Sequence, residues 1–116
     1  MSASTSSSIK TFSDLSAHYG NYIATINSLP STKLDPYLAN SVNHNDRTLS
    51  REEYTKLIIP GSTFTIIDTV VDVNKKQIAA KLDITLEDKK KVKEIVVYAL
   101  DDEWRIERVW SVVEFS

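Results

Sequence analysis

Proton transfer could be carried out by a few side chains of this sequence, and His44 is the first of them. An imidazole has an ordinary pKa of about 6.5, so it can accept or release a proton near neutral pH without a large shift. His44 lies in the polar segment SVNHNDRTLSREEY (41–54), directly before a helix-start signal. The pattern is consistent with a positioned base, and equally with a histidine on a surface loop.

Glu94 is a second candidate for acid/base chemistry. Alternation along VKEIVVYAL (92–100) places Glu94 on the same face as apolar residues. Burial there would raise its pKa and make it a proton donor. The alternative is that Glu94, which has lysines nearby in the sequence, belongs to an exposed strand end.

Glu114 is the third candidate, and its case depends on the last expected strand. Strict alternation along that strand puts Arg108, Trp110 and Glu114 on one face. If Trp110 lines a pocket, the charged pair could clamp a substrate, or it could simply close the core as an ion pair.

Tyr22 lies on an apolar helical stripe, where it could contact a ligand or fill the core.

The first half of the chain is predicted to form three helices. Apolar residues recur at spacings of three and four over 15–29, with Ser13 as the N-cap and a proline at the end. The dipeptide Asp-Pro at 35–36 predicts the start of a short second helix. The third helix is predicted at SREE (50–53), because this sequence is a capping box.

The second half is predicted to form four long strands and one short edge strand. The loops between the long strands are too short for parallel crossovers, so an antiparallel meander is expected. The fold class is therefore α+β, with three N-terminal helices packed on one face of a curved sheet. The long strands are expected at 63–73, 77–86, 92–100 and 104–115.

Length and composition suggest one domain and exclude several classes of partner. We expect a disordered Ser-rich tail at 1–11 and a single domain at 12–116. Fourteen basic and sixteen acidic residues, without a basic helical surface, argue against nucleic acid. With no cysteine, two histidines and two glycines, neither a metal site nor a cofactor is expected. No apolar run reaches about 20 residues, so we expect no membrane contact and a cytoplasmic location.

Four segments of the sequence match a known family in their order and spacing: YIATINSL (22–29), VNHNDRTLSREEY (42–54), KEIVVYALDDEWRI (93–106) and RVWSVVE (108–114). With the order of the predicted elements, they resemble the NTF2-like (cystatin-like cone) superfamily, and most closely its SnoaL-like polyketide cyclase branch. In this family the helices and the concave face of the sheet enclose a conical, mostly apolar pocket, so the resemblance implies a pocket of that kind here.

The resemblance also implies roles for individual residues. It puts His44 at the position of the general base of ketosteroid isomerases, which is an aspartate there. It puts Tyr22 at the position of a tyrosine that hydrogen-bonds the substrate oxygen. His44 and Asn45 are similar to a His-Asn pair of cyclase-like relatives, and Glu94 and Glu114 match acidic positions.

The function expected from these observations is cofactor-free acid/base catalysis on a small hydrophobic molecule, by cyclisation, isomerisation or dehydration. The alternative is a non-catalytic ligand-binding or dimerisation module of the same fold. The catalytic candidates are His44, Glu94 and Glu114, and the substrate-binding candidates are Tyr22, Asn45, Tyr54, Arg108 and Trp110.

Two further expectations come from the resemblance. Relatives commonly dimerise through the open face of the sheet, so a homodimer is expected. Relatives usually carry a glycine in the last hairpin turn, where this chain has Trp104, so that turn is expected to differ in shape. The apolar residues predicted for the dimer face are Ile95, Val97, Ala99, Val109, Val113 and Phe115.

Overall fold

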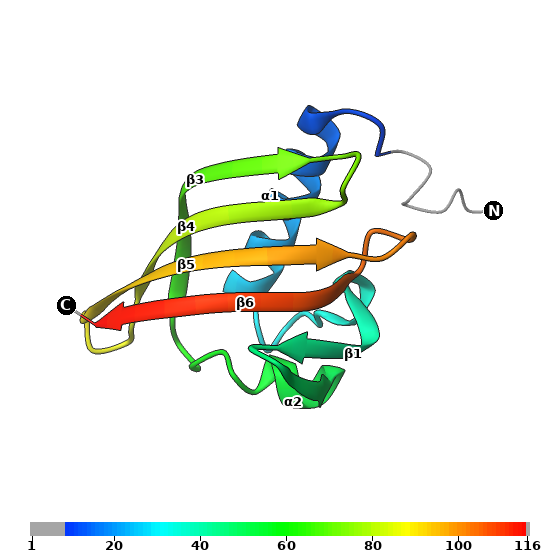
Figure 1. The fold of residues 1–116 in the computed structure, drawn as a ribbon. Coiled ribbons are helices and arrows are strands. Elements are labelled where there is room, and N and C mark those ends of the chain that lie inside the picture. The colour runs from blue at the N-terminus through cyan, green and yellow to red at the C-terminus, as the bar shows by residue number, and fades with distance from the viewer. Residues whose placement is uncertain (1–8, 116) are drawn as a thin grey trace.

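A six-stranded sheet with one long helix against a single face forms the body of the protein (Figure 1). The computed structural model describes residues 9–115. Neighbouring strands are antiparallel, except that β1 and β6 are parallel. No helix within the described residues is long and apolar enough to cross a membrane. In spatial order the strands are β2 (Arg47–Ser50), β1 (Leu38–His44), β6 (Ile106–Phe115), β5 (Lys91–Leu100), β4 (Gln77–Thr85) and β3 (Thr63–Asp72).

Helix α1 (Phe12–Asn27) supplies the helical side of the core. It begins at Thr11, whose hydroxyl accepts a hydrogen bond from the Asp14 backbone N–H, and the Asp14 carboxylate accepts one from the Thr11 N–H. The predicted N-cap, Ser13, is therefore wrong by two residues. The predicted stripe is confirmed, because its buried members are Leu15, Tyr19, Tyr22, Ile23 and Ile26.

The first residues described belong to the domain. Ile9 is buried in the core, and Thr11 caps α1. The domain therefore begins before residue 12, where its start was predicted. Residues 1–8 of the predicted tail lie outside the described part of the chain.

Two α-helices are present among the described residues, instead of the three predicted. Residues Asp35–Tyr37 form only a single 3₁₀ turn, and the chain continues from there directly into β1. The capping box is confirmed, since Ser50 caps α2 (Arg51–Thr55) and the Glu53 carboxylate accepts from the Ser50 N–H at 2.8 Å.

The segment before α2 is a β-hairpin, so the alternative that His44 lies on a surface loop is wrong. Strands β1 and β2 are joined by Asn45 and Asp46, which have φ values of 49° and 69°. Two consecutive residues in this left-handed region make the turn that suits a two-residue hairpin. The sheet therefore has six strands, and His44 is the last residue of a strand.

A β-bulge changes which residues of β6 face the core. Leu100 of β5 pairs with Ile106, but Ala99 pairs with Arg108, so Glu107 is an extra residue. One inserted residue reverses the inward and outward alternation beyond it. Ile106 and Val109 are both buried as a result, and the strict alternation predicted for this strand is wrong.

The turn between β5 and β6 contains a buried tryptophan in an unusual backbone conformation. Trp104 has a φ of 63°, a region that favours glycine, and yet its side chain is only 6% exposed. The Lys76 ammonium lies 5.5 Å from the centre of its ring. Burial of the indole therefore holds a backbone conformation that a non-glycine residue disfavours.

Replacing Trp104 by glycine tests which of these two effects is larger. Loss of a buried tryptophan costs about 3–5 kcal/mol, and relief of the left-handed backbone returns about 1–2 kcal/mol. We expect Trp104→Gly to lower the free energy of unfolding by roughly 1–4 kcal/mol in urea denaturation. The control is Lys89→Gly, at an exposed residue with φ 73°, which should stay within about 1 kcal/mol of the natural chain. A Trp104→Gly protein as stable as the natural chain would contradict this account.

Candidate active site in the cone

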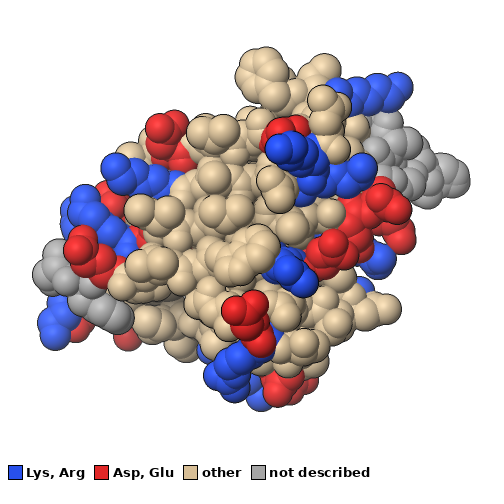
Figure 2. Space-filling view, viewed as in Figure 1, with Lys and Arg blue, Asp and Glu red and all other residues tan. Residues whose placement is uncertain are grey.

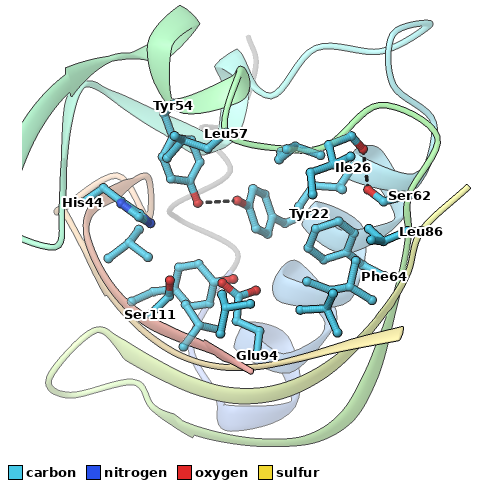
Figure 3. A pocket seen from close by; sticks show the side chains of 18 residues that line it. Tyr22, Ile26, His44, Tyr54, Leu57, Ser62, Phe64, Leu86, Glu94 and Ser111 are labelled. Carbon is cyan, nitrogen blue, oxygen red and sulfur yellow. Dashed lines mark hydrogen bonds between the residues drawn. The ribbon is translucent and has the colours of Figure 1, made fainter. Parts of the chain in front are cut away.

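The concave face of the sheet leaves a cavity of about 380 Å³ beside α1 (Figure 3). Its walls come from α1, α2, the segment 57–62 and the inward faces of β3 to β6, with His44 contributed by β1. This volume lies at the lower end of the range for small-molecule sites, about 300–1,000 Å³. Most of the lining is aliphatic or aromatic, including Ile26, Phe64, Ile84, Leu86 and Val109.

His44 reaches this cavity from the end of β1. Its Cα is paired with that of Val109 in the parallel β1–β6 ladder, and its ring lies edge-on to Tyr54 with 6.1 Å between centroids. Burial lowers the pKa of His44, and the positive charge of Arg47 lowers it further. The imidazole is therefore largely neutral at neutral pH, which is the form that accepts a proton.

Two buried tyrosines form a hydrogen-bonded pair in the cavity wall. The hydroxyls of Tyr22 on α1 and Tyr54 on α2 are 2.8 Å apart (Figure 3). Burial raises the pKa of Tyr54 to about 12 and that of Tyr22 well above 10. Both phenols stay protonated, and because one O–H is used between them, the other remains for a ligand.

Glu94 projects into the cavity from β5, on the wall opposite Tyr54 in Figure 3. The predicted strand parity is confirmed, since its neighbours Val92 and Val96 on the same face are buried. Burial raises the pKa of Glu94, and a hydrogen bond from the Ser111 side chain partly offsets that rise. The carboxyl group is thus biased toward its protonated form.

Asn45 forms hydrogen bonds with the backbone of β6 and does not line the cavity. Its N–H donates to the Val109 carbonyl at 2.9 Å. Its side-chain Oδ1 accepts from the Ser111 N–H at 2.9 Å, and its Nδ2 donates to the Ser111 carbonyl at 3.2 Å. These bonds extend the β1–β6 ladder past the turn, which fixes His44 and Ser111 relative to each other.

Three predicted site residues lie outside the cavity lining: Arg108, Trp110 and Glu114. The bulge at Glu107 turns Val109, Ser111 and Val113 inward, so the residues alternating with them face the open side of the sheet. There the Arg108 guanidinium stacks on the Trp110 ring at 5.4 Å. The expectation that Trp110 lines the pocket is wrong, and Glu114 shares its side of the strand.

Ser111 and Tyr98 also line the cavity, and the sequence did not nominate either as a site residue. Tyr98 shares the inward face of β5 with Glu94, and its hydroxyl is 3.0 Å from that of Tyr19. Alternation along β5 could have identified it. Ser111 could not be found this way, because alternation without the bulge points it outward. No metal-binding group of three or more His, Cys, Asp or Glu side chains occurs among residues 9–115.

Solved structures share this architecture at low sequence identity. AclR from Streptomyces galilaeus, a candidate hydroxylase, superposes with a TM-score of 0.72 and 11% identity over 90% of this chain and 91% of its own. SalBIII, an epoxide hydrolase/cyclase-like enzyme in pyran ring formation of the polyether salinomycin, superposes with a TM-score of 0.68 and 12% identity. The match covers 90% of this chain and 97% of SalBIII. A candidate isomerase of the SnoaL-like family from Agrobacterium tumefaciens superposes with a TM-score of 0.60 and 13% identity, over 84% of this chain and 95% of its own.

These likenesses define the class of fold. Other matching structures are described as NTF2-like proteins, so the chain has the NTF2-like fold, and its structural neighbours include SnoaL-like proteins. No protein-family model matches the sequence, and no curated protein matches it significantly.

Asn45 offers a test of how the wall of the cavity is held. Asn45→Ala removes two side-chain hydrogen bonds, each contributing about 0.5–1.5 kcal/mol, and puts alanine at positive φ, which costs about 1–2 kcal/mol. We expect a loss of roughly 2–5 kcal/mol in unfolding free energy and faster exchange of the Ser111 amide proton.

Asn45→Gly is the matched control, because it lacks the hydrogen bonds but tolerates the backbone conformation. It should fall between the natural chain and Asn45→Ala. If Asn45→Gly is as stable as the natural chain, the side-chain bonds to Ser111 contribute nothing.

Proposed function

We propose that this protein is a cofactor-free acid/base enzyme that acts on a small hydrophobic molecule by isomerisation, cyclisation or dehydration. The observation that carries the proposal is that His44, Glu94 and the Tyr22–Tyr54 pair line one cavity whose other walls are mostly apolar. Titratable groups with pKa values shifted in opposite directions inside such a cavity are characteristic of acid/base sites.

Each group has a distinct role in this proposal. Neutral His44 removes a proton from carbon next to a carbonyl or similar oxygen-bearing group of the substrate. The free O–H of the Tyr22–Tyr54 pair donates to the oxygen that gains negative charge. Glu94, biased toward its protonated form by burial, delivers a proton to the product, and Ser111 orients its carboxyl group. Glu114 has no part, since it lies outside the cavity.

The structural neighbours support this proposal only as a general class. SalBIII is described as epoxide hydrolase/cyclase-like and the Agrobacterium tumefaciens protein as a candidate isomerase. At 12–13% identity these likenesses concern the fold, and the reaction is proposed from the residues of the cavity.

A non-catalytic ligand-binding module is the second candidate. One observation favours it: within the described residues no buried side-chain nitrogen or oxygen lacks a hydrogen-bond partner. The tyrosine hydroxyls already pair with each other, as Tyr22 does with Tyr54 and Tyr19 with Tyr98. A site of this kind can hold a ligand by its apolar walls alone.

Exchange of carbon-bound protons in heavy water tests the first chemical step without knowledge of the natural substrate. We expect the natural chain to accelerate α-proton exchange of a small cyclic ketone such as 2-tetralone, followed by NMR. His44→Gln should slow the catalysed exchange by about 10²–10⁴-fold, the usual contribution of a positioned base. Glu114→Gln is the matched control and should change it less than about twofold. If ketones bind but no exchange is accelerated, the ligand-binding alternative stands instead.

The pH profile of the same reaction should separate the two groups. The pKa of His44 is lowered from 6.5, so the acidic limb should lie below pH 6.5, because only the neutral imidazole accepts a proton. The pKa of Glu94 is raised from 4.5, so activity that needs its protonated form should fall as pH rises through that higher value. His44→Gln should remove the acidic limb, and Glu94→Gln the alkaline one.

We also propose that two copies of the chain associate through the open face of the sheet. In Figure 2 uncharged side chains cover most of the middle of this face, and charged ones gather toward its edges. Val97 pairs laterally with Trp110, and Ile95 with Val112, so the apolar residues of β5 and β6 are adjacent. Ile95 is 60% and Val112 71% exposed, and large exposed apolar surface of this kind is typical of interfaces.

The dimer face differs from the one predicted from the sequence. Ile95, Val97 and Ala99 alternate with the inward residues of β5 and so face outward as predicted. Val109 and Val113 line the cavity instead, because of the bulge. Trp110 and Val112 take their place on β6.

Light scattering at tens of micromolar should give the mass of a dimer. We expect Ile95→Glu combined with Val112→Glu to give a monomer, since two carboxylates at the centre of the face would be buried without partners. The control is Phe12→Glu, at a residue 69% exposed on α1, which should leave the mass unchanged. A monomeric natural chain would contradict this proposal.

A further inference from the structure

No Lys or Arg side chain of residues 9–115 lines the cavity. Within that range Glu94 is the only Asp, Glu, Lys or Arg of the lining, and Arg47, whose charge acts on His44, lies outside it. An anionic ligand would be taken from water into this site without a countercharge and next to a carboxyl group. Burial of an unpaired charge is strongly unfavourable. A cationic ligand would also lose its hydration in this mostly apolar site, where burial already raises the pKa of Glu94 and so disfavours the carboxylate that could pair with it.

The polar and apolar parts of the lining are separated in space. In Figure 3, His44 and Ser111 lie on one side, with Tyr54, Tyr22 and Glu94 near the middle. Ile26, Phe64 and Leu86 form the opposite wall. The Ser62 hydroxyl on that side donates a hydrogen bond to the Ile59 carbonyl at 2.6 Å. A ligand that satisfies both parts has one polar end and an apolar remainder.

The apolar part of the lining continues to the protein surface. Leu57, Ile59 and Val113 line the cavity and are also 51%, 49% and 43% exposed. Exposed apolar side chains that adjoin a cavity mark surface that something covers. Their continuity with the cavity wall identifies the occupant as the outer part of the cavity's own ligand.

We propose that the site binds an uncharged, elongated ligand, with one oxygen-bearing group between His44 and the Tyr22–Tyr54 pair and an apolar tail leaving between Leu57, Ile59 and Val113. This inference uses the proposed function only to identify the polar end of the site. The tail contacts and the selection against charge stand whether or not the protein is a catalyst.

Binding of three matched series of probes tests the inference without any turnover. The probes are 2-alkanones, n-alkanoates and n-alkylamines of six to ten carbons, titrated calorimetrically at pH 7.5 into the full chain. We expect alkanone affinity to rise about fourfold for each added methylene that becomes buried. Alkanoates and alkylamines of equal length should bind at least about tenfold more weakly.

A double variant locates the tail. Leu57→Ser with Ile59→Ser should leave the affinity of the six-carbon alkanone within about twofold and reduce the gain per methylene in the longer ones. Ile67→Ser is the matched control, because Ile67 is also 51% exposed but does not line the cavity. It should leave the whole series unchanged.

Several results would overturn the inference. An alkanoate or alkylamine that binds as tightly as the alkanone of equal length would exclude selection against charge. A gain per methylene that is unaffected by the double variant would exclude the tail path. A double variant that changes the molecular mass in solution, and not the chain-length dependence, would show that the mouth is an interface between copies. None of these results depends on proton exchange. Failure of the proposed catalysis can therefore be distinguished from failure of the proposed ligand binding.

Discussion

A single helix cannot cover the concave face of this sheet, and the cavity exists because of that mismatch. Six strands spaced about 4.8 Å apart span about 24 Å, whereas a helix with its side chains is about 10–12 Å wide. Helix α1 packs mainly on β3, and its Tyr19 and Tyr22 meet Tyr98 of β5. The remaining width is covered by α2 and the segment that follows it, which leaves a space between the helices and the sheet that reaches the surface beside Leu57, Ile59 and Val113.

The cost of burying polar atoms determines what can line that space. Tyrosine hydroxyls and a carboxyl group are stable there only with partners, and each has one: Tyr22 with Tyr54, Tyr19 with Tyr98, and Glu94 with Ser111. The same burial that requires these partners shifts the pKa values of His44 and Glu94 in opposite directions. The hydrogen bonds of the wall and the shifted pKa values of its groups therefore have one physical origin.

The sequence predicted well those features of the fold that depend on interactions between residues close together in the chain. The capping box at Ser50 and the apolar stripe of α1 are set by contacts between neighbouring residues, and both are present. The β1–β2 hairpin was missed, although Asn45 and Asp46 are residues that tolerate positive φ and could have signalled a two-residue turn. Strand β1 was harder to recognise because it pairs with β6, more than 60 residues away in the chain.

The sequence by itself determined the α+β class and the grouping of Glu94 with apolar residues on one face of its strand, and it nominated His44, because strand alternation and capping act over a few residues. Only the tertiary structure decided which face of β6 lines the cavity, since one extra residue at Glu107 reverses the alternation and no local pattern marks it. It also placed Glu94 in the cavity lining and Glu114 outside it, and it showed that the Asn45 side chain hydrogen-bonds the backbone of Ser111. These outcomes depend on pairing between distant strands, which composition and spacing do not specify.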